Sequence, residues 1–252
     1  MDFAEQVVLV TGGSRGIGRA IAIEFACKGA SVVVQYRSDD NAAQQTLDAL
    51  PPGAHTAARA DVSDPNEVRS LVDRIIDEFG RIDVLVNNAG IYEAHAVLDT
   101  SYEEWQESWR RTIDTNLIGP ANLIHAVVPH MVSAGAGRIV NVSSRGAFRG
   151  EPTHAAYGAS KAGLNSLGQS MARALAPFGI YVTGVAPGFV ETDMAAPYLD
   201  SPAGEAIRAQ SPMNRAAAPE EIARVVVFLA TPGAESTTGT IVDVNGASYL
   251  RT

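Results

Sequence analysis

The chain has 252 residues, of which 46% are hydrophobic and 19% charged, as is typical of a globular protein with a substantial core. Its 28 acidic and 19 basic residues give a formal net charge of −9, and no basic run is longer than Arg110-Arg111, which disfavours polynucleotide binding. No apolar run reaches the length that crosses a bilayer and the first residues lack a signal-peptide pattern, so we expect a cytoplasmic protein that does not bind membranes.

A short apolar strand is predicted at residues 6–10, and it leads into a glycine turn and then a helix at 20–26. The glycines are spaced as Gly12-x3-Gly16-x-Gly18. Glycines let the backbone approach a pyrophosphate closely, and the N–H groups at a helix start attract an anion. The turn therefore indicates a dinucleotide site, although a glycine turn can also be purely structural. Cys27, among apolar residues next to this helix, is expected to be buried.

The second strand is predicted at residues 31–35 and is followed by Arg37. Proteins that select NAD commonly place a carboxylate at this strand end for the ribose 2′-hydroxyl, whereas an arginine suits a 2′-phosphate. Here the nearest acids, Asp39 and Asp40, lie beyond Arg37, and Arg15 lies within the glycine turn. We therefore predict NADP(H) as the cofactor. The alternative is that both arginines are solvated surface residues.

The middle of the chain continues with a helix at 40–50, a weak strand at 55–58, and a helix that starts after Asp64 with Pro65 and ends at Gly80. A fourth strand at 83–86 leads into an Asn-Asn-Ala-Gly turn whose small residues leave room for a flat ring. Residues 103–131 are expected to form one long helix. Asn116 is unfavourable in mid-helix, so its amide either caps a local break or has a functional partner.

A fifth strand at 137–144 ends in Ser143-Ser144, and the helix after it carries Tyr157 and Lys161 four residues apart on one face. A cation within about 4–6 Å favours the phenolate, so Lys161 and a second cation, such as an oxidised nicotinamide ring, would lower the pKa of Tyr157 and make it a proton shuttle. The pair alone is also compatible with a packed aromatic beside a solvated lysine. A sixth strand is predicted at 180–186, a final helix at 219–230 and a last strand at 240–244.

Strands and helices alternate from end to end without a linker or repeat, which predicts an α/β fold with one doubly wound parallel sheet. We expect about seven strands in the order 3-2-1-4-5-6-7, helices on both faces, and a single dinucleotide-binding domain over residues 1–252. The loosely patterned segment at about 189–215 is where a substrate lid would lie. The motifs all follow strand ends, which places the binding site at the carboxyl edge of the sheet.

The sequence resembles the short-chain dehydrogenase/reductase family over nearly its whole length. The resemblance is carried by Thr11-Gly12-x3-Gly16-x-Gly18, Asn87-Asn88-Ala89-Gly90, Asn116, Ser144, Tyr157-x3-Lys161 and Pro187-Gly188-x3-Thr192. It implies that Tyr157 is the general acid or base and that Ser144, thirteen residues before it, holds the substrate oxygen. Lys161 would lower the pKa of Tyr157 and bind the nicotinamide ribose, and Asn116 would hold a water that supplies protons to Lys161.

The same resemblance implies the cofactor contacts. Asp61 and Val62 would contact the adenine, Asn87 and Gly90 the ribose region, and the segment after the sixth strand the carboxamide. The full set expected to bind NADP(H) is Gly12, Ser14, Arg15, Gly16, Ile17, Gly18, Arg37, Asp61, Val62, Asn88, Ala89, Gly90, Tyr157, Lys161, Pro187, Gly188, Val190 and Thr192. No metal is expected, because no His, Cys and Asp cluster has ligand spacing.

The function implied is an NADP(H)-dependent oxidoreductase that reduces a small ketone or carbonyl substrate to an alcohol, or the reverse, as a homotetramer. Within the family, the arginine in the glycine turn and the ending Val244-Asn245-Gly246 most resemble 3-oxoacyl-(acyl-carrier-protein) reductases, which are the first alternative. Such an enzyme needs basic residues for an acidic carrier protein. This chain has residues 133–136, Ser-Ala-Gly-Ala, and Pro177-Phe178 where the family carries them.

A second alternative comes from another class of protein. The same fold could belong to a non-catalytic, nucleotide-sensing regulatory protein. The sequence also leaves open whether His95 and His154 line the pocket or are plain loop residues.

Overall fold

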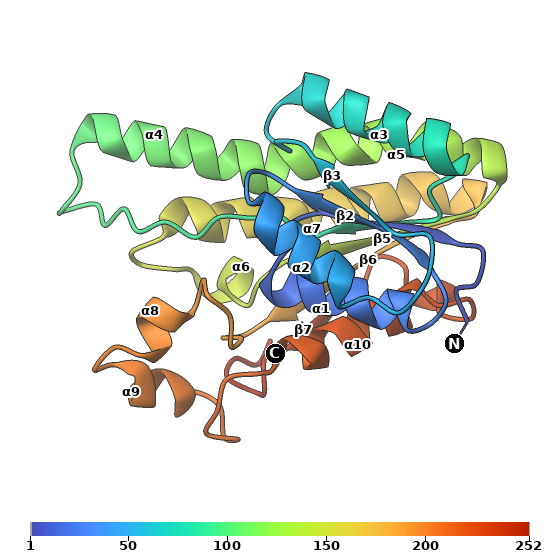
Figure 1. Ribbon diagram of the computed structural model, residues 1–252. Helices are drawn as coiled ribbons and strands as arrows, with labels where there is room; N and C mark the ends of the chain where they lie inside the picture. The colour runs from blue at the N-terminus through green and yellow to red at the C-terminus, as the bar shows by residue number, and fades with distance from the viewer. Residues whose placement is uncertain (1, 252) are drawn as a thin grey trace.

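The computed structural model describes residues 2–251 and contains a seven-stranded, all-parallel sheet in the order β3-β2-β1-β4-β5-β6-β7 (Figure 1). The predicted fold class and strand order are confirmed. Met1 and Thr252, the two ends of the expected 1–252 domain, lie outside the described residues. The strands are β1 Val7–Val10, β2 Ser31–Tyr36, β3 Thr56–Arg59, β4 Val84–Asn87, β5 Gly137–Val142, β6 Ile180–Pro187 and β7 Ile241–Val244.

Helices cover both faces of this sheet (Figure 1). The α-helices are α1 Gly16–Ala26, α2 Asp40–Asp48, α3 Pro65–Phe79, α4 Tyr102–Ile113, α5 Gly119–Ala134, α6 Gly146–Arg149, α7 Ala155–Leu175, α8 Ala196–Leu199, α9 Gly204–Arg208 and α10 Pro219–Ala230. Short helical turns of other types are η1 Asp114–Ile118, η2 Ala176–Phe178 and η3 Glu235–Thr237.

Alternation of side chains along the strands divides the core into two layers. Val8 and Val10 of β1 pack with α1 and α10 on one face, whereas Val7 and Leu9 pack with α3, α5 and α7 on the other. Both faces of the central strands are therefore apolar, as a parallel sheet covered on both sides requires.

Local capping explains where helix α3 begins and ends. The Asp64 carboxylate accepts the N–H groups of Asn66 and Glu67 at the start of α3, and Pro65 occupies its first turn. Gly80, with φ of 75°, ends the helix in the left-handed conformation. The predicted bounds of this helix are confirmed.

Two expectations about helices are wrong. Cys27 is exposed rather than buried, because it forms the C-cap of α1 where the chain leaves the helix. The single helix expected across 103–131 is interrupted between α4 and α5 by the π-helical turn η1, which contains Asn116. A π turn adds one residue to the helical repeat and is frequent at functional sites.

One stretch of the described chain, Tyr102–Ala134, is long and apolar enough to cross a membrane by length and composition, which was not expected from the sequence. A third of its most apolar window is buried. Leu123, Ile124 and Val127 of this stretch pack in the core against the sheet. Packing of a core helix therefore accounts for part of its apolar character.

Candidate active site

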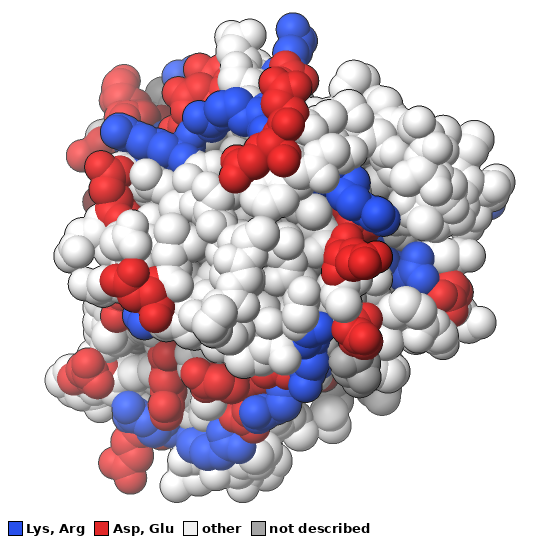
Figure 2. Space-filling model, turned by 45° about the vertical axis from the view of Figure 1, so that its right-hand side comes forward, with Lys and Arg blue, Asp and Glu red and all other residues white. Residues whose placement is uncertain are grey.

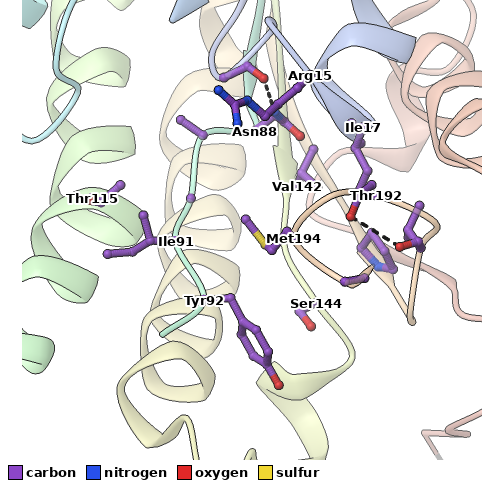
Figure 3. Close-up of a pocket in the computed structure, with 18 of the residues that line it drawn as sticks. Arg15, Ile17, Asn88, Ile91, Tyr92, Thr115, Val142, Ser144, Thr192 and Met194 are labelled. Carbon is purple, nitrogen blue, oxygen red and sulfur yellow. Dashed lines mark hydrogen bonds between the residues drawn. The ribbon is translucent and has the colours of Figure 1, made fainter. Parts of the chain in front are cut away.

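A cavity of about 540 Å³ lies at the carboxyl edge of the sheet. Every residue in the predicted cofactor set lines it, from Gly12 of the glycine turn to Thr192 in the segment after β6, and so does Ser144. Figure 3 shows Arg15 and Asn88 towards one end of this cavity and Ser144 towards the other. The convergence follows from the fold, since the carboxyl ends of parallel strands meet at one edge.

Asn87 is an exception among the expected contacts. It is the last residue of β4 and is buried, and its Nδ2 donates to Asn141 Oδ1 at 2.9 Å. It does not line the cavity, so the expectation that it contacts the cofactor ribose is wrong. The next residue, Asn88, points to the other side because successive strand side chains alternate.

The glycine turn forms a cradle for an anion. Gly12 and Gly16 have φ of 61° and 53°, which residues other than glycine rarely adopt. A Cβ on Gly18 would collide with the carbonyl of Gly12. Helix α1 has no side-chain cap, so the N–H groups of its first turn remain available to a ligand. Free N–H groups at the start of an 11-residue helix fit a pyrophosphate.

Thr11 and Asn88 hold this cradle in place. The Thr11 hydroxyl accepts the N–H groups of Asn88 and Ala89 and donates to the carbonyl of Val86. In return, Nδ2 of Asn88 donates to the carbonyl oxygens of Thr11 at 2.8 Å and Gly12 at 3.2 Å. Asn88 therefore joins the end of β4 to the glycine turn.

The arginines at the mouth of the cavity suit a 2′-phosphate. Arg37 is exposed, and within residues 2–251 its side chain has no hydrogen bond or ion pair. Arg15 pairs with Asp39 at 2.8 Å, and the two side chains are 56% and 45% exposed. An exposed pair of this kind contributes only about 0–1 kcal/mol, so Arg15 can exchange its partner for a phosphate.

Tyr157 and Lys161 lie on the same side of α7 and both line the cavity. Lys161 Nζ is 5.8 Å from the centroid of the Tyr157 ring and donates to the carbonyl of Val142 at 2.8 Å. Burial lowers the pKa of Lys161 to about 8. The two side chains therefore adjoin each other without a direct hydrogen bond.

Lys161 by itself does not bring the pKa of Tyr157 towards neutrality, and the prediction that Lys161 and a second cation together do so stays a prediction. Burial raises the pKa of Tyr157 to about 12, and this exceeds the opposing effect of a hydrogen bond with Ser144. Glu151, which also lines the cavity, adds to the rise. Tyr157 keeps part of its surface open to the cavity, which tempers the burial.

Ser144, and not Ser143, is the serine whose side chain opposes the rise in the pKa of Tyr157. Ser144 Oγ also accepts the N–H of Gly146 at 3.0 Å, at the start of α6. Ser143 is buried, and its hydroxyl donates to the carbonyl of Lys161 at 3.3 Å. The choice of Ser144, made from spacing, stays a prediction.

Asn116 is fully buried and does not line the cavity. Its Oδ1 accepts the N–H of Ile91 at 2.8 Å, and its Nδ2 donates to the carbonyl of Ile91 at 3.0 Å and to Ser160 Oγ at 3.2 Å. Asn116 lies in a helical break, but its amide bonds Ile91 and Ser160 rather than the backbone of the break, and a functional role for it stays a prediction. The side chain fixes the loop after β4 against α7.

An aromatic wall beside Tyr157 was not predicted. Tyr92 stacks on His154 with ring centroids 3.7 Å apart and meets Tyr157 edge-on at 4.7 Å. The Tyr198 hydroxyl lies 2.8 Å from His154 Nε2, which links α8 to the start of α7. Figure 3 shows Tyr92 at the same end of the cavity as Ser144. Nothing in the local sequence pattern marks these residues, because their contacts join distant segments.

The two histidines left open by the sequence are buried and do not line the cavity. His95 Nε2 accepts the N–H of Ala156 at 3.0 Å, and its Nδ1 lies 2.8 Å from the carbonyl of Glu93. Burial lowers the pKa of His154 to about 4. His154 therefore supports the wall as a neutral side chain, and His95 supports it through its contact with the backbone of Ala156. Across residues 2–251, no three His, Cys, Asp or Glu side chains cluster as metal ligands.

Comparisons with known proteins agree with this geometry. The family described as Enoyl-(Acyl carrier protein) reductase matches residues 12–247. The chain is 41% identical to 3-oxoacyl-(acyl-carrier-protein) reductase FabG of Escherichia coli strain K12, over 99% of this chain and 100% of that protein. It is 39% identical to the protein of the same name from Staphylococcus aureus, over 96% of this chain and 97% of the relative.

Two solved structures are also similar. One is described as the crystal structure of gox2181, with a TM-score of 0.90 and 31% identity over 98% of this chain and 96% of that one. The other is a variant of actinorhodin polyketide ketoreductase with NADPH, with a TM-score of 0.88 and 32% identity over 96% of this chain and 97% of that one.

Proposed function

The chain belongs to the short-chain dehydrogenase/reductase family, and from this premise we propose that it is an NADP(H)-dependent reductase of a ketone or other carbonyl compound. One observation carries the proposal. A single cavity brings Ser144, Tyr157 and Lys161 together with the glycine cradle and the exposed Arg37. Bound NADPH supplies the hydride, and the protein supplies position and a proton.

Ser144 and Tyr157 are the residues that would act on the substrate oxygen. Ser144 would donate a hydrogen bond to the carbonyl oxygen and Tyr157 would give it a proton. The pKa of about 12 keeps the Tyr157 phenol protonated at neutral pH, which is the form that reduction needs. Burial thus keeps the proton on Tyr157, and it also makes the phenol a weaker acid than one with a pKa near 7.

Lys161 would bind the nicotinamide ribose and pass a proton to Tyr157. Its pKa of about 8 leaves the ammonium mostly charged at neutral pH while making its proton easier to release than that of a free lysine. Asn116 holds the loop that places Gly90 against Lys161, since a Cβ on Gly90 would lie 3.5 Å from Nζ. We propose that a water held near Asn116 returns the proton to Lys161.

The segment at about 189–215 would act as the substrate lid. Its helices α8 and α9 extend from the edge of the sheet (Figure 1), and Figure 3 shows Met194 and Thr192 reaching into the cavity. The contact between Tyr198 and His154 ties this segment to α7, beside the catalytic tyrosine. Opening would break that contact and release the product.

The first alternative, a 3-oxoacyl-(acyl-carrier-protein) reductase, is favoured by the names of the relatives. A surface that docks an acidic carrier needs a basic area. On the face in Figure 2, Lys and Arg side chains lie beside Asp and Glu rather than in one continuous basic area. We propose a small, free carbonyl substrate and, by family analogy, a cytoplasmic homotetramer. The intact Ser144, Tyr157 and Lys161 argue against a non-catalytic sensor.

Oxidation of NADPH in the presence of a panel of ketones tests the proposal. Turnover with free ketones that is comparable to, or faster than, turnover with an acyl-carrier thioester supports it. Turnover with the thioester alone would establish the alternative enzyme, and binding of NADPH without any turnover would support the sensor.

A further inference from the structure

Arg145 is a buried cation in the wall of the catalytic cavity. It follows Ser144 directly, is 3% exposed, and lines the cavity. Its Nη2 donates to Oε1 of Gln210 at 2.7 Å, and its guanidinium lies 5.1 Å from the centroid of the Phe189 ring. Among the described residues, no carboxylate lies within ion-pair distance of it. A buried charge without an opposite charge costs several kcal/mol.

A second guanidinium adds to the positive charge at this point. Nη1 of Arg149 donates to the same Gln210 Oε1 at 3.2 Å, so two cations share one neutral amide oxygen. Glu151 lies 3.5 Å from Arg149 and offsets one of the two charges. Burial and the neighbouring Arg149 lower the pKa of Arg145 to about 10, so it remains charged at neutral pH. One positive charge is therefore left over beside the substrate.

Arg145 still has hydrogen-bond donors to offer. A guanidinium carries five N–H donors, of which one is committed to Gln210. Within residues 2–251 its side chain forms no other hydrogen bond, and Arg145 lines the catalytic cavity. Arg145 and Phe189 also line a smaller cavity of about 260 Å³, so these two side chains lie between the two cavities. A ligand group there would lie close to a carbonyl held by Ser144.

We propose that the substrate carries a carboxylate that binds Arg145, so that the enzyme acts on a small oxo acid and its hydroxy acid. The proposal rests on the proposed function, since it names the substrate class of the same site. A planar carboxylate matches the fork of a guanidinium with two parallel hydrogen bonds. A carrier-bound thioester has no charge at this position, so Arg145 favours the free acid.

The test compares oxo acids, in a series with increasing spacing between ketone and carboxylate, with their methyl esters. The wild-type protein should prefer an acid, and Arg145→Met should reduce the ratio of acid to ester in kcat/KM by about 10- to 100-fold, as expected for a lost charge-assisted bond. Gln210→Glu, which supplies the missing negative charge from the protein, should lower the same ratio. Arg224→Met removes an exposed arginine on α10 and should leave the ratio unchanged.

A measurement of ligand binding distinguishes failure of this inference from failure of the proposed function. Calorimetry with the hydroxy acid should show an affinity that falls in Arg145→Met and in Gln210→Glu, whether or not turnover is found. Ketone reduction without preference for the acid would overturn the inference and leave the function intact. If Arg145→Met lowered kcat/KM equally for acid and ester, Arg145 would only hold Gln210 in place, and the inference would be overturned. Preferential binding of the acid without any redox turnover would overturn the proposed function instead.

Discussion

Replacement of Lys161 by methionine tests how this site controls a proton. Oxidation of an alcohol needs the Tyr157 phenolate, whose population below its pKa rises tenfold for each pH unit. Lys161 Nζ lies 5.8 Å from the Tyr157 ring centroid. At that distance a unit charge stabilises the phenolate by about 3 kcal/mol at an effective dielectric constant of 20, and by about 0.7 kcal/mol in bulk water. These energies correspond to roughly 2 and 0.5 pH units.

We therefore expect Lys161→Met to slow alcohol oxidation at pH 7 by about 3- to 100-fold through this effect. Because the pKa of Lys161 is about 8, the wild-type protein loses the ammonium as pH rises further. The difference in the rate of alcohol oxidation between the wild-type protein and Lys161→Met should then become smaller above about pH 8. Lys161→Arg keeps the charge and should retain more activity at neutral pH.

The assay is kcat/KM for alcohol oxidation with NADP⁺ as a function of pH in the wild-type protein and both variants. Fluorescence titration with NADPH measures the separate effect on cofactor affinity. A deficit that is the same at every pH would refute the electrostatic argument. Lys161 would then act by positioning the cofactor alone.

Four further changes have defined outcomes. Tyr157→Phe should lower turnover by at least about 10²- to 10⁴-fold while NADPH still binds, and near-normal rates would dismiss the assigned acid. Arg37→Asp should shift the ratio of kcat/KM from NADPH towards NADH; an unchanged ratio would remove Arg37 from cofactor selection. A metal chelator should leave activity unaffected, and inactivation would reveal a missed site. His154 has a pKa lowered from 6.5 to about 4, so its contribution to stability is present above pH 6.5 and is lost as pH falls through about 4. In His154→Asn, the Tm should therefore depend less on pH between 6.5 and 4, and thermal melts with the wild-type slope would contradict this.

The cavity could be located from the sequence because its parts are each marked locally. The start of a helix at Asp64 and Pro65 can be predicted from neighbouring residues alone. A glycine turn can be predicted in the same way from the apolar run that precedes it. Once the strands are known to be parallel, their carboxyl ends must share one edge, and the motifs that follow them come together. The glycine turn and Asn88-Ala89-Gly90, which are marked in this way, lie in the cavity wall, whereas Asn87, predicted with them, does not.

Features that depend on contacts between distant segments could not be found in this way. The wall of Tyr92, His154 and Tyr198 joins three loops or helices that share no spacing rule. The contact of Arg145 with Gln210 spans 65 residues. Asn87 shows a second reason why prediction from sequence fails. Neighbouring residues of a strand point to opposite sides, so an error of one residue moves a side chain from the cavity to the sheet interior.

The pKa of Tyr157 was missed for a reason that bears on the direction of the reaction. Spacing along a helix reports how close two charges are, whereas the loss of water around them depends on the complete fold. Burial raises the pKa of Tyr157 to about 12 and lowers that of Lys161 to about 8, so it favours the neutral form of both groups. A neutral phenol can give a proton to a carbonyl at pH 7 but cannot accept one from an alcohol. Burial of this pair therefore favours reduction at neutral pH, and oxidation requires alkaline pH or a further positive charge beside the phenol.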